Sequence, residues 1–183
     1  MSVSSARMSV FVGEDFACVR IVGRANFTSS IDFKTLLNEL RQKGYERFLL
    51  DLSQCVLMDS TFLGVLAGFG LKLCAVQKEP RGPRLELLNP NARVTELLES
   101  LGVLHLFTIR NGLTLVPAGT PAAVPVPADA SPEAVARACL EAHQTLMELN
   151  PDNISRFKDV AQFLAEDLKK LGGRPDSAAG PRM

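Results

Sequence analysis

The sequence has no surplus of charge of either sign, since twenty Lys and Arg residues balance twenty Asp and Glu residues among its 183. Proteins that bind the phosphate backbone of nucleic acids need concentrated positive charge, because much of their affinity comes from released counterions. We therefore expect no nucleic-acid partner. The length suits one domain of ordinary size with an appendage.

Long apolar segments are also missing. The most apolar stretch, residues 62–76, is too short to span a bilayer and contains Lys72, and the first ten residues lack the apolar centre of a signal peptide. We therefore expect neither export nor membrane insertion. The four cysteines are far apart and form no Cys-x-x-Cys pair, which is typical of reduced core cysteines in a cytoplasmic protein.

Residues for catalysis and metal binding are few. His105 lies in an apolar strand pattern and His143 in a helical pattern, where each is interpreted as a core or surface residue rather than a ligand. Asp51 and Asp59 have no third acid, neighbouring histidine or phosphate-binding glycine-rich loop beside them. The sequence therefore predicts no enzyme, no metal site and no cofactor.

What the sequence does contain is a regular alternation of strand and helix patterns. The predicted strands are residues 8–13, 16–23, 47–52, 84–88 and 104–109, and the predicted helices are residues 29–44, 60–76 and 91–101. The first two strands form a hairpin, and each later strand follows a helix. This order, β-β-α-β-α-β-α-β, predicts an α/β fold with a mixed sheet of about five strands and covering helices.

Composition changes after this first domain, which we assign to residues 1–116. Residues 117–130 contain four prolines and many alanines without periodicity and are interpreted as a linker. Residues 131–172 predict a C-terminal α-helical hairpin that turns at Pro151, because proline disfavours a continuous helix. Residues 173–183 have no pattern and are predicted to be disordered.

Both helices of the hairpin carry apolar residues at alternating steps of three and four, a heptad seam. The seam consists of Val135, Cys139, Ala142, Leu146 and Leu149, followed by Ile154, Phe157, Ala161, Leu164, Leu168 and Leu171. A single hairpin of this size seldom folds alone. The seam therefore predicts a homodimer through residues 131–172 or binding to a protein partner, with docking onto the chain's own first domain as the alternative.

A hydroxyl pair, Ser60-Thr61, follows Asp59 where the third strand leads into the second helix. One interpretation is that Asp59 or Ser60 caps the helix by accepting a hydrogen bond from a free backbone N–H group. The other is a functional site, since open α/β sheets place ligands at the carboxyl ends of their strands. The local sequence leaves both open.

Three segments together resemble the STAS family of bacterial anti-sigma factor antagonists. FLLDLSQCVLMDSTFLGVLAG is similar to the family's strand, Asp-Ser turn and apolar helix, and RIVGRANF to its Gly-x-x-Asp turn. LELLNPNARVTELLESLGVLHLFTI is similar to its last strand–helix–strand unit. The resemblance covers about residues 8–116 and implies a STAS-like fold and a non-enzymatic regulatory protein of the cytoplasm.

In that family, a partner serine kinase of the GHKL type, which also acts as an anti-sigma factor, phosphorylates the serine after the aspartate. The resemblance implies Ser60 as the acceptor, Thr61 as the second candidate, and a PP2C-like phosphatase as a further partner. A constitutive structural subunit of a lipid transporter or signalling scaffold is the alternative. The implied partner surface consists of Gly23, Arg24, Asn26, Asp59, Ser60, Thr61, Phe62 and Leu63.

Two of these positions depart from the family pattern. Phe62 stands where many members have glycine, and its ring is either a hydrophobic anchor for a partner or a core residue. Asn26 replaces an acid, and it is either part of the partner surface or a residue that caps or turns the chain after Gly23.

Overall fold

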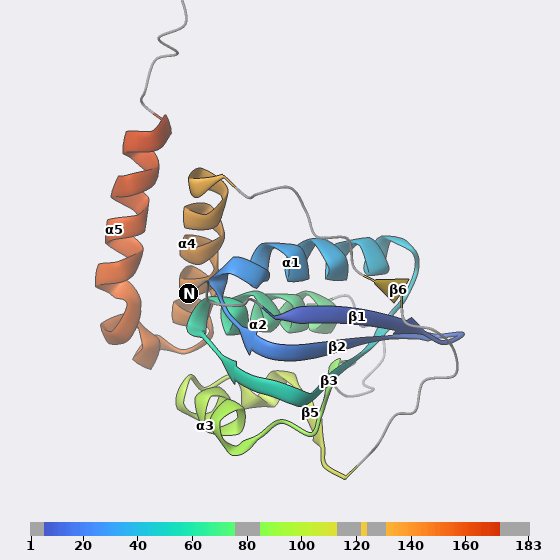
Figure 1. Cartoon of the computed structure of the whole chain (residues 1–183). Helices are drawn as coiled ribbons and strands as arrows, with labels where there is room; N and C mark the ends of the chain where they lie inside the picture. The colour runs from blue at the N-terminus through green and yellow to red at the C-terminus, as the bar shows by residue number, and fades with distance from the viewer. Residues whose placement is uncertain (1–5, 76–84, 113–121, 124–130, 173–183) are drawn as a thin grey trace, which may run out of the picture.

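The computed structural model describes residues 6–75, 85–112, 122–123 and 131–172, and its centre is a six-stranded mixed sheet (Figure 1). The strands are β1 (Arg7–Val12), β2 (Phe16–Ala25), β3 (Arg47–Met58), β4 (Leu85–Leu88), β5 (Thr108–Arg110) and β6 (Ala122–Ala123). Their spatial order is β5-β4-β3-β2-β1-β6. Strand β1 pairs antiparallel with β2, and β2 through β5 pair in parallel, which confirms the predicted α/β fold with an N-terminal hairpin.

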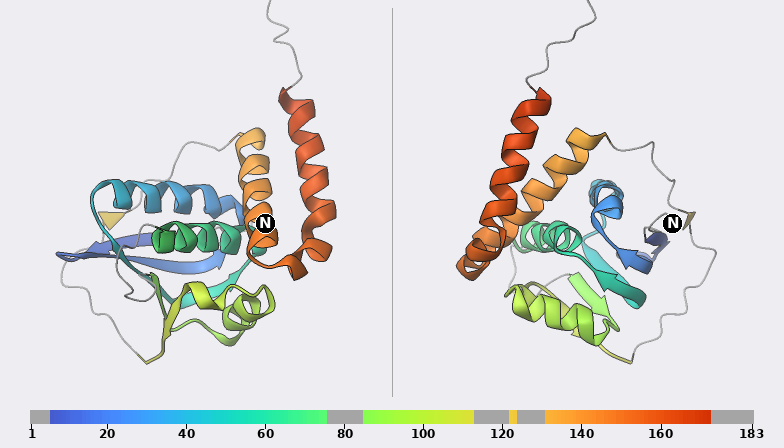
Figure 2. Two further views of the ribbon diagram at one scale, coloured as in Figure 1. Left: turned by 180° about the vertical axis from the view of Figure 1, so that it is seen from behind. Right: turned by 60° about the vertical axis from the view of Figure 1, so that its left-hand side comes forward.

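The helices are α1 (Phe27–Gln42), α2 (Ser60–Ala75), α3 (Ala92–Ser100), α4 (Pro132–Leu149) and α5 (Ile154–Gly172), with short 3-10 helices η1 (Leu104–Leu106) and η2 (Pro151–Asn153). Helices α1 and α2 lie against one face of the sheet (Figures 1 and 2). That face and the helices form the main core, to which alternate residues of β3 contribute, namely Phe48, Leu50 and Leu52. A smaller cluster of Cys18, Leu49 and Leu88 lies on the opposite face.

Two strand boundaries differ from the prediction. Strand β3 continues past residue 52 to Met58, because its pairing with β2 extends through two register shifts as far as Ala25 opposite Met58. The predicted strand at 104–109 is wrong for its first half. Backbone N–H groups of Leu106 and Phe107 donate to the carbonyls of Val103 and Leu104, so His105 lies in η1 rather than in a strand.

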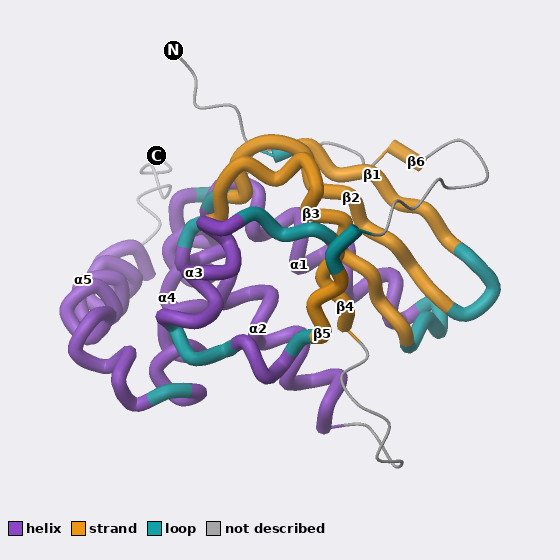
Figure 3. Tube along the Cα trace, turned by 90° about the horizontal axis from the view of Figure 1, so that it is seen from below, coloured by secondary structure: helices purple, strands orange, loops and turns teal. Residues whose placement is uncertain are grey.

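One strand falls inside the predicted linker. Strand β6 pairs with β1 at the edge of the sheet, as Figure 3 shows. The rest of the predicted linker at 117–130 and the predicted disordered tail at 173–183 lie outside the described residues.

The C-terminal helices extend the fold on the helical side. Helix α4 packs across α2 and α1, and α5 packs on the outer side of α4 (Figure 2). The Ser131 hydroxyl caps α4 by accepting from the Ala134 N–H at 3.2 Å, and Pro151 begins the break at η2. The predicted seam is used within the chain: Ala142 and Leu146 are buried, and Leu146 belongs to the main core. Docking onto the chain's own first domain, the alternative prediction, is therefore what the structure shows for α4.

The structure offers no membrane-spanning segment in the residues it describes, since none of their helices is both long and apolar enough. The four cysteines are all free.

Candidate functional site at the start of helix α2

Asp59 occupies the turn between β3 and α2 and organises the candidate site. Its carboxylate oxygen Oδ1 accepts from the backbone N–H of Phe62 at 2.8 Å, which caps α2 as one interpretation predicted. The other oxygen, Oδ2, accepts from the backbone N–H of Phe27 at 2.7 Å. One carboxylate therefore joins the first turns of α1 and α2, and its charge is favourable at both helix N-termini.

Asn26 has a capping role at the start of α1. Its Oδ1 accepts from the backbone N–H of Thr28 at 3.2 Å and from the Thr28 hydroxyl at 2.6 Å, and its own N–H donates to the Ser29 hydroxyl at 3.2 Å. The reciprocal arrangement is a capping box, so the predicted cap is confirmed. Three residues earlier, Gly23 has φ of 97°, a conformation that favours glycine, and the following Arg24 is exposed.

The parallel pairing of β2 with β3 brings these two segments together. Ala25 lies opposite Met58 in the register, and the Asp59 N–H donates to the Ala25 carbonyl at 2.9 Å. Asn26 and Asp59 are therefore neighbours at the carboxyl edge of the sheet, the edge at which open α/β folds usually bind ligands.

Ser60 is the first residue of α2 and is half-buried. Its hydroxyl oxygen lies 3.0 Å from Nε2 of His143 on α4, and the His143 Nδ1 lies 2.7 Å from the Cys139 carbonyl oxygen. A carbonyl only accepts, so Nδ1 carries the ring proton and Nε2 accepts from the Ser60 hydroxyl. Burial lowers the pKa of His143 and outweighs the opposing effects of the Cys139 carbonyl and Asp59, so the neutral imidazole is favoured.

Thr61 is covered by the same helix. Only 5% of its surface is exposed, and its hydroxyl donates to Sγ of Cys139 at 3.6 Å. Burial raises the pKa of the Cys139 thiol, and Asp59 adds to the rise, so the thiol stays protonated and weakly nucleophilic. Of the two predicted acceptors, Ser60 is the more accessible.

Leu63 was assigned to the partner surface, and Phe62 was predicted to be either a partner anchor or a core residue; both are fully buried. The Phe62 ring stacks on Phe33 of α1, with ring centroids 4.4 Å apart. The cause is the helical phase of α2, which turns Phe62, Leu66 and Phe69 toward the main core. The surface assignment of Phe62 and Leu63 is therefore corrected to core.

His143 and Cys139 are the site residues that the sequence did not identify. They are one helical turn apart on α4, and Cys139 was noticed only as a member of the seam. Nothing in the local sequence of α4 indicates that this turn lies against Ser60, because the contact spans 83 positions.

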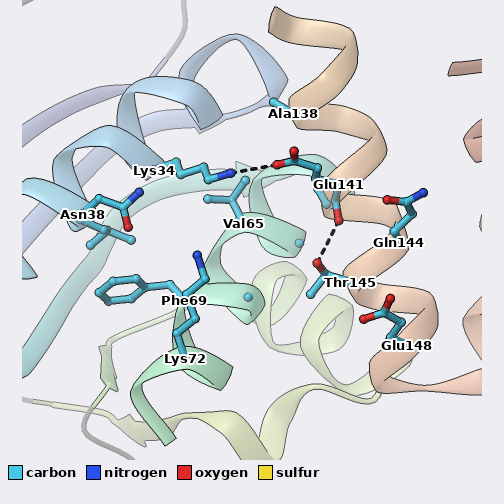
Figure 4. A pocket seen from close by; sticks show the side chains of 14 residues that line it. Lys34, Asn38, Val65, Phe69, Lys72, Ala138, Glu141, Gln144, Thr145 and Glu148 are labelled. Carbon is cyan, nitrogen blue, oxygen red and sulfur yellow. Dashed lines mark hydrogen bonds and ion pairs between the residues drawn. The ribbon is translucent and has the colours of Figure 1, made fainter. Parts of the chain in front are cut away.

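A cavity of about 280 Å³ lies between α1, α2 and α4 (Figure 4), and its lining does not include Asp59, Ser60 or Thr61. Its walls include Val65 and Phe69 of α2, with Lys34, Lys72 and Glu141 among the charged residues around it. Lys34 and Glu141 form an ion pair at 2.9 Å between α1 and α4. Among the described residues, no group of three His, Cys, Asp or Glu side chains is arranged to hold a metal ion.

Comparison with known proteins gives one family and one fold. Residues 8–114 match the model of the STAS domain family. A Thermotoga maritima protein proposed to be an anti-sigma factor antagonist is 20% identical, with a TM-score of 0.50 over 58% of this chain and 86% of that one. An anti-sigma factor antagonist from Mycobacterium paratuberculosis is 15% identical, with a TM-score of 0.50 over 59% of this chain and 87% of that one. No protein with a curated description matches the sequence.

Proposed function

Because the chain belongs to the STAS domain family through residues 8–114, we propose that it is a regulatory binding protein of the anti-sigma factor antagonist type, acting in the cytoplasm without catalysis of its own. Its partner is a serine kinase that also acts as an anti-sigma factor, and phosphorylation of Ser60 releases that partner. We assign this role to a domain at residues 1–116, with residues 131–172 as an attached helical hairpin.

The observation that carries the proposal is the position of Ser60. It begins α2 directly after Asp59, at the carboxyl edge of the parallel strands, and it is more exposed than Thr61. Gly23 and Arg24 lie in the last three residues of the neighbouring strand β2 and, with Asn26, complete the edge that a partner would contact. Ser60 is therefore the acceptor in this proposal.

The charge of a phosphoryl group supplies the switch. It adds about −1.5 to −2 charges at neutral pH, next to an Asp59 carboxylate whose two oxygens are already held by backbone N–H groups. The N-terminus of α2 favours that charge, because its free backbone N–H groups and helix dipole attract anions. In a desolvated interface, like charges repel, and each 1.4 kcal/mol or so of lost binding energy lowers affinity about tenfold.

Peptide mapping and intact-mass measurement on the protein isolated from its own cell test the proposal. We expect phosphate on Ser60 in a fraction that changes with growth conditions, and loss of the added mass after phosphatase treatment. Ser60→Ala in the same cell is the control for site assignment. A chain without phosphate at Ser60 and Thr61 under all conditions, yet recovered with a transporter or scaffold, would instead establish the constitutive subunit.

A further inference from the structure

Helix α4 lies over the Ser60 corner of its own chain. His143 of α4 is hydrogen-bonded to the Ser60 hydroxyl, and Cys139 of α4 accepts a hydrogen bond from the Thr61 hydroxyl. His143 is itself 7% exposed and packs against the ring of Phe157 on α5, with centroids 4.9 Å apart. Both hydroxyls of the corner therefore face a second layer of helices rather than open solvent.

Small residues allow this close approach. A Cβ atom placed on Gly64, one turn after Ser60, would lie 2.5 Å from the Ala142 carbonyl oxygen and 2.7 Å from the Ala142 Cβ. The backbones of α2 and α4 thus touch at this point with no room for a methyl group. At Gly68, the next turn, an added Cβ would meet only the Thr145 side chain at 3.6 Å, an ordinary contact distance.

We propose that α4 is an occluding helix: it competes with the protein partner for the start of α2, so that the partner reaches Ser60 only after α4 detaches. The proposal rests on the proposed function and adds its regulation. A kinase has to bring a phosphate donor up to the Ser60 oxygen, and the His143 ring stands 3.0 Å from that oxygen. A phosphoryl group on Ser60 would occupy the same space.

Linkage makes the effect reciprocal. If docking of α4 lowers the affinity of Ser60 for its partner, partner binding lowers the docking of α4 by the same factor. Phosphate on Ser60 opposes docking as well. The modified protein is therefore expected to release both the partner and its own α4 from this face.

The contact between α4 and the first domain is incompletely packed along the side that faces α1. The cavity of about 280 Å³ leaves the space between α1, α2 and α4 incompletely filled, and interfaces with voids lose dispersion contacts (Figure 4). The Lys34–Glu141 ion pair that crosses it is largely exposed, with side-chain exposures of 41% and 51%, and such pairs stabilise little. The far end of α4 is held more firmly, because Leu146 is fully buried and the Asn153 amide donates to the Leu101 carbonyl at 2.9 Å.

The test uses the full chain and needs no partner. A Ser60→Cys substitution places a reporter thiol at the acceptor position, and its labelling by a maleimide is followed by peptide mass spectrometry. The reporter is combined with Gly64→Ala, which forces α2 and α4 apart, or with the matched Gly68→Ala, which makes the same chemical change where space exists. Cys74 is exposed and gives the reference rate in every sample.

With Gly64→Ala, we expect the reporter thiol to be labelled at least tenfold faster than in the chain that carries Ser60→Cys alone. With Gly68→Ala, the labelling rate should stay within twofold of the rate in that chain. Cys18 and Cys55 are buried in the sheet domain and should stay unlabelled, which shows that the domain remains folded. If Gly64→Ala exposes them, Ala142→Leu opens the same contact from α4 and has to give the tenfold increase.

Equal labelling rates of the reporter thiol in all backgrounds, whether fast or slow, would overturn the occlusion. Because no kinase or partner is present, this result is separate from the phosphate mapping that tests the proposed function. The two tests can also disagree. If the unaltered protein is phosphorylated at Ser60 in the cell but the Ser60→Cys thiol is fully accessible in every background, the proposed function stands and the proposed occlusion by α4 is rejected.

Discussion

The Ser60 hydroxyl oxygen lies 3.0 Å from Nε2 of His143, although 83 positions separate the two residues. This hydrogen bond joins the proposed acceptor residue of the STAS domain to a helix outside the family match, which ends at residue 114. Any change in the charge or size of either residue is therefore felt by both the corner and the docking of α4.

Acidification should loosen α4. In the docked state, burial lowers the pKa of His143 below its ordinary value of 6.5, against the opposing influence of the Cys139 carbonyl and of Asp59. Above pH 6.5 or so His143 is neutral in both states and docking is at full strength. As pH falls below that value, the detached state takes up a proton that the docked state refuses, so docking weakens.

Hydrogen exchange of α4 amides at pH 7.5 and 5.5, corrected for intrinsic rates, measures this effect. Residues 136–146 should lose protection at the lower pH relative to β3 in the same sample. His143→Gln keeps a polar side chain without a titrating ring and should abolish the difference. Unchanged protection in the unaltered chain would contradict the prediction.

Phe62→Ala should lower the stability of the fold rather than only the affinity for a partner. Phe62 is fully buried and stacks on Phe33, so its removal leaves a cavity in the main core. We expect a loss of about 3–5 kcal/mol in the free energy of unfolding, measured by urea titration followed by circular dichroism. Phe62→Leu, which refills part of the volume, should cost clearly less. A stability equal to that of the unaltered chain would argue against the core assignment.

Asp51→Asn should lower the stability of the fold, because Asp51 joins β2 to β3 through Arg20. The Asp51 carboxylate accepts from Arg20 Nε at 2.9 Å and from the Ser53 hydroxyl at 2.6 Å. Burial by itself would raise the pKa of Asp51, but the hydrogen bonds from Ser53 and Arg20 outweigh it and hold the pKa below its ordinary value of 3.8. We expect a loss of about 1.5–3 kcal/mol in the free energy of unfolding at pH 7, as for hydrogen bonds to a charged group.

The difference in stability between Asp51→Asn and the unaltered chain should depend on pH. The stabilisation from Asp51 is present above its ordinary pKa of 3.8 and is lost as pH falls through the lower, folded-state pKa. The gap between Asp51→Asn and the unaltered chain in urea unfolding should therefore shrink below pH 3.8. A gap that stays constant to lower pH would mean that the carboxylate charge is not the stabilising feature.

Ser60→Asp should imitate the phosphorylated state. We expect it to leave the fold intact and to weaken binding of the cognate serine kinase at least tenfold, because it places a second carboxylate beside Asp59. Ser60→Ala should retain binding but be insensitive to ATP. Calorimetry with the kinase encoded nearest to this protein's gene checks both variants, and tight binding by Ser60→Asp would disprove release by charge.

The predicted homodimer cannot use the seam of α4, which packs on its own chain. A dimer is still expected through the exposed apolar residues of α5. Val160 and Phe163 are exposed there, at 44% and 66%. We expect light scattering at micromolar concentration to give twice the chain mass, and Phe163→Glu to restore the mass of one chain. Gln162→Glu, beside it and also exposed, is the charge-matched control. A full chain that is already monomeric would exclude the dimer.

Local patterns predicted much of this molecule. The N-terminal hairpin, the strand and helix order and the two C-terminal helices follow from periodicity, since the spacing of apolar residues along one element is a local property of the sequence. The capping roles of Asn26 and Asp59 also follow from residue type at a helix start. The strand prediction at 104–109 was wrong in its first half because η1 and an apolar strand bury similar side chains.

The sequence by itself therefore determined the STAS fold and the position of the Asp59-Ser60 corner, and only the tertiary structure decided what covers that corner. The apolar seam indicates that one face of α4 is buried, but it does not indicate by what. A second copy of the chain, a protein partner or the chain's own α2 would bury that face equally well. The glycines of α2 show the same limit: Gly64 accommodates Ala142 of α4, whereas Gly70 faces Phe107 of the first domain. Which surface meets which depends on long-range packing, and that is a property of the folded chain as a whole.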